Sequence, residues 1–187
     1  MAAPIVVGIS GASGAVYGIE VLRALKRLGQ PSHLIISEMG GRTLAIESDL
    51  SLDEVRALAH VVHNNKDLAA PVSGGSFLTR GMIVAPCSIK TLSGIANAFS
   101  HNLMIRAADV TLKERRPLVL LVRETPLHLG HLRLMSQVAE IGAVVMPPVP
   151  AFYNRPATIM DLVRHSVGRA LDHLGIEHDL LERWTGP

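Results

Sequence analysis

A glycine-rich turn near the start of the chain could bind an electron-rich or anionic ligand. Residues 11–14 read Gly-Ala-Ser-Gly and follow an apolar run that ends at Ile9. Apolar residues then recur at helical spacing, so the turn lies where a helix begins. Backbone N–H groups and the positive end of the helix dipole at that point suit a phosphate or another electron-rich edge. A turn that needs glycine only for packing is the alternative.

The spacing of the glycines favours a mononucleotide over NAD as a ligand of this turn. Gly8, Gly11 and Gly14 do not reproduce the G-x-G-x-x-G spacing of dinucleotide-binding turns. Dinucleotide-binding folds also carry an acidic residue at the end of the second strand, where it binds the ribose. Here Ser37 lies at the end of the second expected strand, and the acidic residue Glu38 follows it.

A basic segment predicts a site for a small anion. Between residues 101 and 133 there are six lysines or arginines against three acids, a net +3 that exceeds the +2 of the whole chain. Arg106 and Lys113 are seven residues apart on one face of an expected helix, with Asp109 between them. Such a helix face can bind a phosphate, although solvated surface charge is the alternative.

Two carboxylates that follow apolar segments are candidates for proton transfer. Glu47 follows an apolar stretch, and Glu124 follows both a strand-like run and Arg123. A carboxylate in such a position either has a raised pKa and transfers protons or is held in a salt bridge. Cys87, which follows another strand-like run, is typical of a small buried thiol rather than a nucleophile.

The other candidate groups also have two interpretations. His60 with His63 has the i, i+3 spacing of metal ligands, as does a second histidine pair at 128 and 131, but no carboxylate or cysteine motif accompanies them. We therefore expect no metal. Trp184, the one tryptophan, either anchors the C-terminal segment in the core or forms an aromatic wall for a ligand.

The elements that must position these residues indicate one α/β domain over residues 1–187. Short, mostly apolar runs at 4–9, 33–37, 82–85, 118–122 and 143–146 predict the strands of a sheet that is buried on both faces. Helices are expected at 19–28, 41–48, 51–59, 91–98, 103–115, 129–139 and 158–174, and 64–75 is expected to be a loop. This alternation predicts a three-layer, doubly wound parallel sheet of flavodoxin-like or Rossmann-like type, which binds ligands at the carboxyl ends of its strands.

The composition excludes several classes of protein. With 48% hydrophobic and 18% charged residues the chain is not of the disordered type. No apolar run approaches the roughly 20 residues of a membrane span, and the start lacks a basic leader, so we expect no membrane association and a cytoplasmic location. A net charge of +2 predicts no nucleic-acid partner. A mean hydropathy of +0.31 indicates surface buried between subunits.

Several longer motifs resemble one known family. They are GISGASGAVYG at 8–18, PCSIKTL at 86–92, RAADV at 106–110 with LKERRPLVL at 112–120, VRETPL at 122–127 and PPVPAFY at 147–153. Together they resemble the UbiX family of flavin prenyltransferases, in the branch associated with phenylacrylic and hydroxyarylic acid decarboxylases. The similarity runs from about residue 4 to residue 184.

The resemblance implies a homododecamer that attaches a dimethylallyl group to reduced FMN without a metal. The donor would be dimethylallyl phosphate or diphosphate, and the product, prenylated FMN, would serve a UbiD-type decarboxylase. Matched position by position, the FMN-binding residues would be Gly11, Ala12, Ser13, Ser37, Ser88, Ile89, Lys90, Thr91 and Arg123. The donor phosphate would be held by Arg106, Lys113, Glu124, Tyr153 and Arg169. Ser13, Glu47, Lys113 and Glu124 would be catalytic, and Trp184 would enclose the prenyl group.

Other functions remain open at this point. A flavin-dependent decarboxylase could act directly on an aromatic acid, but such relatives use an asparagine-containing motif and an early histidine, whereas this chain has Pro86-Cys87-Ser88 and no histidine before His33. A non-catalytic carrier of FMN would share every flavin contact without needing the phosphate site. An NAD-dependent enzyme is a third possibility. Lys90 also departs from many UbiX relatives, which carry a small residue there.

Overall fold

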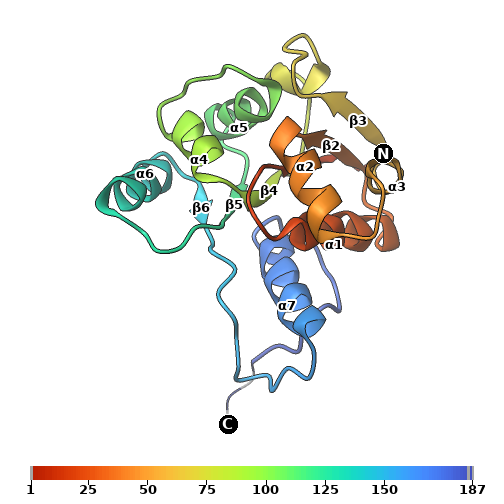
Figure 1. The fold of residues 1–187 in the computed structure, drawn as a ribbon. Coiled ribbons are helices and arrows are strands. Elements are labelled where there is room, and N and C mark those ends of the chain that lie inside the picture. Colours follow the sequence, from red (N-terminus) through yellow and green to blue (C-terminus); the bar gives the residue numbers. More distant parts are fainter. Residues whose placement is uncertain (1, 185, 187) are drawn as a thin grey trace.

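The apolar runs of the sequence become strands because helices cover both faces of the sheet that they form. In the computed structural model, which describes residues 2–184 and 186, these elements alternate along the chain (Figure 1). The strands are β1 (Ile5–Ile9), β2 (Ser32–Ile36), β3 (Val61–Asn64), β4 (Gly81–Cys87), β5 (Leu118–Val122) and β6 (Val144–Val145). The helices are α1 (Ala15–Arg27), α2 (Glu38–Glu47), α3 (Leu52–Arg56), α4 (Ile89–Ala96), α5 (Leu103–Lys113), α6 (Leu129–Glu140) and α7 (Ile159–Asp172), with a short 3-10 helix η1 (Pro71–Ser73).

The described strands form one parallel sheet in the order β3-β2-β1-β4-β5-β6. β1 lies in the middle, where Ile5 is in register with Ser32 on one side and with Gly81 on the other. From β1 the chain adds β2 and β3 on one side, and it then returns to add β4, β5 and β6 on the other side of β1. This order is that of Rossmann folds, and without the edge strand β3 it is the flavodoxin-like order. The predicted fold class is confirmed.

The edge strand β3 was not expected. Residues 61–63 lie between the helix predicted to reach residue 59, which ends at Arg56, and the predicted loop, whose first residue, Asn64, ends the strand. β3 is four residues long, pairs with β2 alone, and leaves Val61 and Val62 39% and 42% exposed. Such a short edge strand depends on a neighbour distant in sequence, so no local periodicity reveals it.

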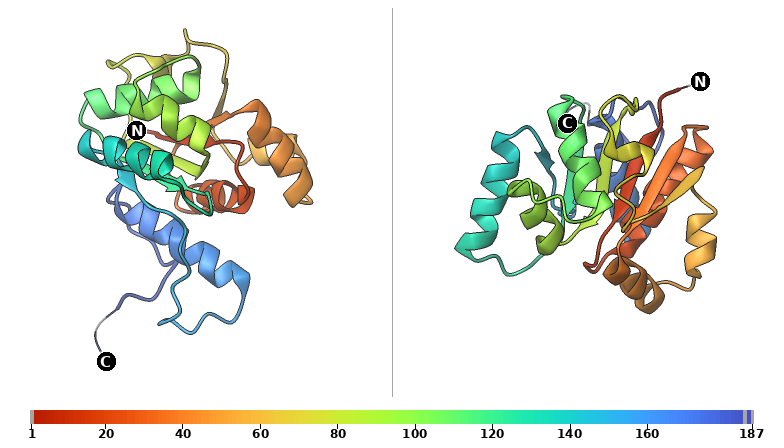
Figure 2. Two further views of the ribbon diagram at one scale, coloured as in Figure 1. Left: turned by 60° about the vertical axis from the view of Figure 1, so that its left-hand side comes forward. Right: turned by 90° about the horizontal axis from the view of Figure 1, so that it is seen from above.

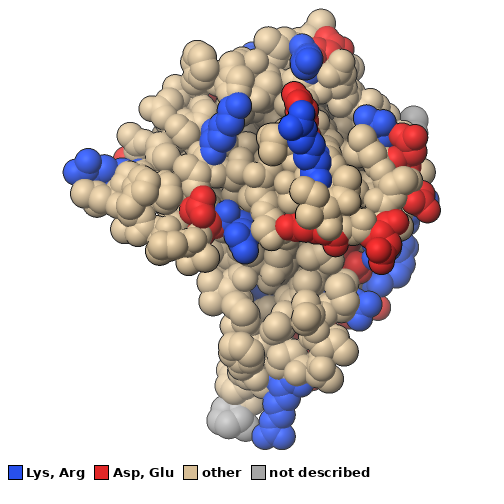
Figure 3. Space-filling view, in the orientation of Figure 1, with Lys and Arg blue, Asp and Glu red and all other residues tan. Residues whose placement is uncertain are grey.

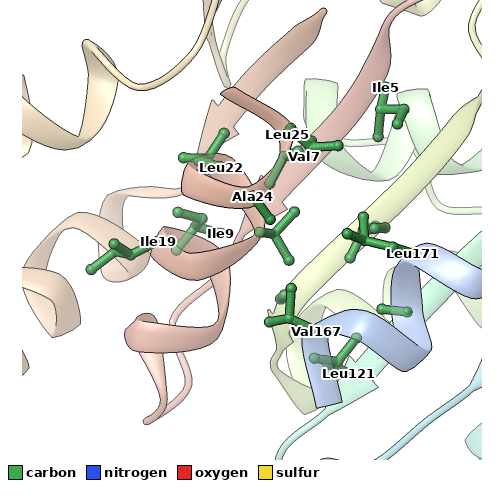
Figure 4. Packing of buried hydrophobic residues seen from close by; sticks show 14 of the residues in the cluster. Ile5, Val7, Ile9, Ile19, Leu22, Ala24, Leu25, Leu121, Val167 and Leu171 are labelled. Atoms are coloured by element: carbon green, nitrogen blue, oxygen red, sulfur yellow. The ribbon is translucent and has the colours of Figure 1, made fainter. Parts of the chain in front are cut away.

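Helices lie on both faces of the sheet (Figure 2), and each face has a core of its own. Alternate residues of β1 serve both: Ile5, Val7 and Ile9 pack with α1 and α7, whereas Val6 packs on the side of α4 and α5. Figure 4 shows the first core, in which Leu22 and Leu25 of α1 and Leu171 of α7 meet these strand residues. Each fully buried side chain of this size contributes about 1.5–3 kcal/mol.

Polar caps begin several helices at the carboxyl edge of the sheet. Ser37 follows β2 and accepts a hydrogen bond from the N–H of Gly40, and Ser88 follows β4 and accepts one from Thr91. Ser51 and Glu54 form a capping box at the start of α3. No helix among the described residues is long and apolar enough to cross a membrane.

Candidate functional site

A cleft of about 1130 Å³ opens at the carboxyl ends of the strands, beside the point where β1 and β4 diverge. Its wall comes from the loops after β1, β2, β3, β4 and β5 and from the start of α5. Six of the nine residues expected to bind FMN line it, namely Gly11, Ser37, Ser88, Ile89, Lys90 and Thr91. Figure 3 shows that charges of both signs lie near the middle of this face of the molecule, whereas the lower part has few.

A buried serine, Ser10, connects the loop after β1 to the end of β4 at the centre of the site. The Ser10 hydroxyl donates a hydrogen bond to the carbonyl of Pro86 (2.8 Å) and accepts one from the N–H of Ser88 (2.7 Å). Because Ser10 is 1% exposed, water does not compete for these bonds. The serine thus fixes the loop after β1 against the loop after β4.

Close backbone packing explains one glycine of the turn. A Cβ on Gly11 would lie 2.3 Å from the Cβ of Met39 at the start of α2. Another requirement is conformational, since Gly14 has a φ of 101°, a left-handed conformation that favours glycine. Packing therefore contributes to this glycine pattern, as the alternative interpretation proposed.

The start of α1 is occupied by a carboxylate of the chain itself. The Oε2 atom of Glu47 accepts hydrogen bonds from the N–H groups of Gly14 (2.8 Å) and Ala15 (3.0 Å). These are N–H groups that the sequence suggested for a phosphate. A second anion at the same donors would be repelled by Glu47, which speaks against a phosphate at these two groups and leaves the other ligand type expected here, an electron-rich edge, as a prediction.

The environment of Glu47 favours its ionised form. Partial burial raises the pKa of Glu47, but hydrogen bonds from the Ser13 hydroxyl and from two N–H groups, with the charge of Arg123, outweigh it and leave the pKa below its ordinary value. Of the two interpretations of this carboxylate, the one with a raised pKa is therefore wrong. At neutral pH Glu47 can accept a proton but has none to give.

Arg123 and Glu124 enter the site from the end of β5. The N–H of Arg123 donates to the carbonyl of Cys87 (3.0 Å), which sets the start of this loop. The charge of Arg123 also lowers the pKa of Tyr17, against a larger rise caused by burial, so the arginine lies close to the α1 turn. Glu124 lines the cleft, and its Oε1 accepts from the N–H of Thr125 (3.0 Å).

Residues that the sequence did not assign to a flavin or phosphate site complete the cleft. Arg56, His63, Lys66 and His101 are among them. The side chain of Asn65 accepts a hydrogen bond from the N–H of Met104 (2.9 Å), which ties the segment after β3 to the start of α5. Lys66 was missed because β3 was not predicted, although the asparagine pair Asn64-Asn65 was a usable turn signal. Arg56 and His101 lie beside other elements, and no local pattern assigns them to a site.

The two predicted phosphate-binding cations of α5 do not face this cleft within one chain. Arg106 donates to the carbonyl of Ser73 (3.1 Å) and pairs with Asp109 (2.7 Å). Lys113 pairs with its neighbour Glu114 at the far end of the helix. α5 has 11 residues, so this end lies about 15 Å along the helix from the end that borders the cleft.

The remaining predicted donor-site residues gather around α7. The Tyr153 hydroxyl lies 2.9 Å from Nε2 of His165, and the rings of Tyr153 and Trp184 meet edge to face with centroids 5.6 Å apart. A hollow of about 420 Å³ is lined by Tyr153 and Trp184. Trp184 is 65% exposed, so it does not anchor the core and instead forms part of the wall of this hollow. Arg169 follows His165 by one helical turn and lowers its pKa, after a larger effect of burial.

Cys87 is the small buried thiol that the sequence suggested. Burial raises the pKa of the Cys87 thiol to about 12, so it stays protonated and is a poor nucleophile. Within residues 2–184, no group of three or more His, Cys, Asp or Glu side chains is placed to hold a metal ion. His33 and His63 do form a pair, with Nδ1 and Nε2 2.9 Å apart.

Comparison with known proteins places the chain in a family. A family model described as Flavoprotein matches residues 2–168. The flavin prenyltransferase UbiX of Thauera aromatica is 57% identical over 182 residues, covering 97% of this chain and 94% of that protein. UbiX of Escherichia coli K12 is 57% identical over 185 residues, covering 97% and 98%. The chain belongs to the UbiX family of flavin prenyltransferases. The resemblance inferred from the motifs is confirmed.

Solved UbiX structures share the whole fold. AnUbiX (PadA1), in complex with FMN and dimethylallyl pyrophosphate, has a TM-score of 0.98 and 52% identity, and the match covers 100% of this chain and 99% of that one. A dodecameric FMN-dependent UbiX-like decarboxylase from Escherichia coli O157:H7 has a TM-score of 0.95 and 46% identity, with 98% and 100% covered.

Proposed function

We propose that this chain is a flavin prenyltransferase that transfers a dimethylallyl group from dimethylallyl phosphate or diphosphate to reduced FMN. Its product, prenylated FMN, is the cofactor of a UbiD-type decarboxylase. The observation that carries the proposal is the cleft beside β1 and β4 in a chain of the UbiX family, because six of the nine residues that the family resemblance assigns to FMN line it.

The cleft fits FMN in both shape and chemistry. The first N–H groups of α4, just after Ser88, have no partner within the helix, and Lys66 and Lys90 add positive charge to the same lining. We assign the FMN phosphate to this helix start rather than to α1, where Glu47 already holds the N–H groups. Apolar side chains of Ile36, Ile89 and Ile105 offer contacts to a ring. When bound, reduced FMN supplies the electron-rich ring that accepts the dimethylallyl group.

The acidic residues of the site divide the proton transfers between them. Glu47, ionised and bonded to the Ser13 hydroxyl, is suited to take up the proton released when a new ring closes. Glu124 lies in the cleft and is suited to deliver a proton to the departing phosphate. Arg123, close to Glu47, adds positive charge that keeps this carboxylate ionised.

The donor phosphate site requires more than one copy of the chain. Arg106 and Lys113 of α5 are held away from Tyr153 and Arg169, so one chain cannot place all four around one phosphate. We propose that subunits of a homo-oligomer, the expected dodecamer, bring them together. Exposed apolar residues such as Leu129, which is 60% exposed, offer surface for these contacts. We also retain a single domain over residues 1–187 and a cytoplasmic location, consistent with one unpaired cysteine.

An anaerobic mass measurement tests this function. Purified protein is incubated with reduced FMN and dimethylallyl phosphate, and the extracted cofactor is weighed by mass spectrometry. We expect a gain of one five-carbon unit. In matched reactions, Lys113→Ala and Glu124→Gln should bind FMN but form no adduct. Unmodified FMN from the wild type would favour a carrier, and turnover of an aromatic acid by this protein alone would favour direct decarboxylation.

A further inference from the structure

One carboxylate at the end of α7 binds three partners from two parts of the chain. Asp172 accepts from Nη1 of Arg169 at 2.9 Å and from both terminal nitrogens of Arg183 at 2.8 and 3.2 Å. Nε2 of His178 lies 3.1 Å from the same carboxylate, whose side chain is 17% exposed. Arg169 belongs to α7, whereas Arg183 and His178 belong to the segment that follows it. Asp172 therefore fixes that segment on the helix.

The hydrogen bonds of His178 determine which ring nitrogen carries its proton. Nδ1 accepts from the N–H of Leu180 (3.2 Å), so Nε2 must be the donor, and it also faces the carbonyl of Gly168 at 2.8 Å. The His178 side chain is completely buried. His178 thus holds the C-terminal segment against α7 a few residues before Arg183 and Trp184.

The charges of this cluster leave one positive charge for a ligand. Asp172 carries one negative charge, and Arg169 and Arg183 carry one positive charge each. Arg183 neutralises the negative charge of Asp172. The positive charge of Arg169 therefore remains, although Arg169 also pairs with Asp172. Arg169 uses Nη1 to bind Asp172, and its guanidinium has further N–H groups that can bind a phosphate oxygen.

We propose that Asp172 is a positioning residue for the prenyl donor. It orients Arg169 directly, and through Arg183 it holds Trp184 against Tyr153, so that a cation and an aromatic wall reach the donor in a fixed arrangement. This inference rests on the proposed function, which assigns Arg169, Tyr153 and Trp184 to the donor.

The substitution Asp172→Asn separates positioning from simple charge, because the two predict opposite effects. Removal of a negative charge near a phosphate site would tighten binding of the donor if only net charge mattered. Loss of the charge-assisted bonds to both arginines should instead weaken it, with about a tenfold rise in KM for dimethylallyl phosphate. We expect kcat to stay within about threefold and FMN binding to be unchanged. A variant that was merely unstable would lower kcat and leave KM unchanged.

The sole tryptophan provides a second readout. Trp184 should rotate more freely in Asp172→Asn, so its fluorescence anisotropy should fall, and titration of its emission with dimethylallyl phosphate gives the Kd without turnover. Asp179→Asn is the matched control, because Asp179 also pairs with an arginine, Arg27 at 2.9 Å, in the same C-terminal segment but does not contact Arg169. It should leave both KM and anisotropy unchanged.

Arg183→Gln supplies an independent variant that keeps the bond between Asp172 and Arg169. It should lower the anisotropy of Trp184 and raise KM, because Asp172 then cancels the charge of Arg169. Unchanged or lower KM and Kd in Asp172→Asn, or unchanged anisotropy, would overturn the inference. If the wild type forms no prenyl adduct, the proposed function fails, while the anisotropy and the Kd still decide the role of Asp172.

Discussion

Glu47→Gln tests whether a carboxylate from the end of α2 stabilises the start of α1. In the structure this carboxylate accepts hydrogen bonds from Gly14 and Ala15, and its pKa lies below the ordinary value of 4.5. Glutamine has nearly the same shape and keeps a carbonyl oxygen as acceptor, so the substitution removes mainly the negative charge. The variant should therefore be less stable than the wild type at neutral pH.

The size of this effect follows from the bonds and from their exposure. Loss of a helix cap costs about 0.5–2 kcal/mol, and a carboxylate strengthens such bonds through its charge. Because Glu47 is an exposed residue, solvent screening places the loss near the lower part of that range, at about 1 kcal/mol. For a chain of this length, that corresponds to a fall in Tm of roughly 2–4 °C.

The stability difference between the wild type and Glu47→Gln should depend on pH in one direction. A carboxylate whose pKa is lowered on folding stabilises the protein above its unfolded pKa, and the contribution is lost as pH falls through the folded pKa. The difference between wild type and Glu47→Gln should thus be full above about pH 5 and should shrink toward pH 3. Urea denaturation at several pH values measures it. Glu140→Gln removes a charge whose carboxylate accepts only a bond from the Ser136 hydroxyl (3.1 Å), so it is the control and should show little change. Equal stabilities at pH 7, or a difference that grows in acid, would refute the reasoning.

Three further substitutions or treatments test the packing around the cleft. Ser10→Ala leaves the N–H of Ser88 without its partner, and the Pro86 carbonyl keeps only the N–H of Ser10 (3.2 Å), so the free energy of unfolding should fall by about 1–3 kcal/mol in urea denaturation, and an unchanged value would contradict its bridging role. Gly11→Ala places a Cβ 2.3 Å from that of Met39, so bound flavin, read by absorbance, should be lost, and a normal flavin content would show that α2 can yield. Cys87, with a pKa of about 12, should react with a disulfide reagent only after denaturation, and fast labelling of the native protein would disprove its burial.

Local signals were enough to predict most of the helices and the buried strands. The runs that became β1 and β5 are unbroken and apolar because both faces of the sheet are covered. The helix starts at Ser51 and Thr158 depend on hydrogen bonds within the first turn, so they are visible in a few consecutive residues. The long motifs also sufficed to identify the UbiX family, since several of them occur in the right order.

Contacts between distant residues decided what the sequence left open. The edge strand β3 exists only because β2 lies beside it, and Lys66 is in the cleft only because that strand places it there. The partner of the α1 start, Glu47, is more than 30 residues away, which no spacing rule anticipates.

The sequence by itself determined the type of fold, the family and the residue types available for binding a phosphate and a flavin. Only the tertiary structure decided which of them meet: Arg106 and Lys113 face the η1 side of the molecule, whereas Arg169 is held by Asp172 beside the C-terminal segment. The physical reason is that helix and strand propensities act over a few residues, whereas a binding site depends on side chains that the packing of whole elements brings together.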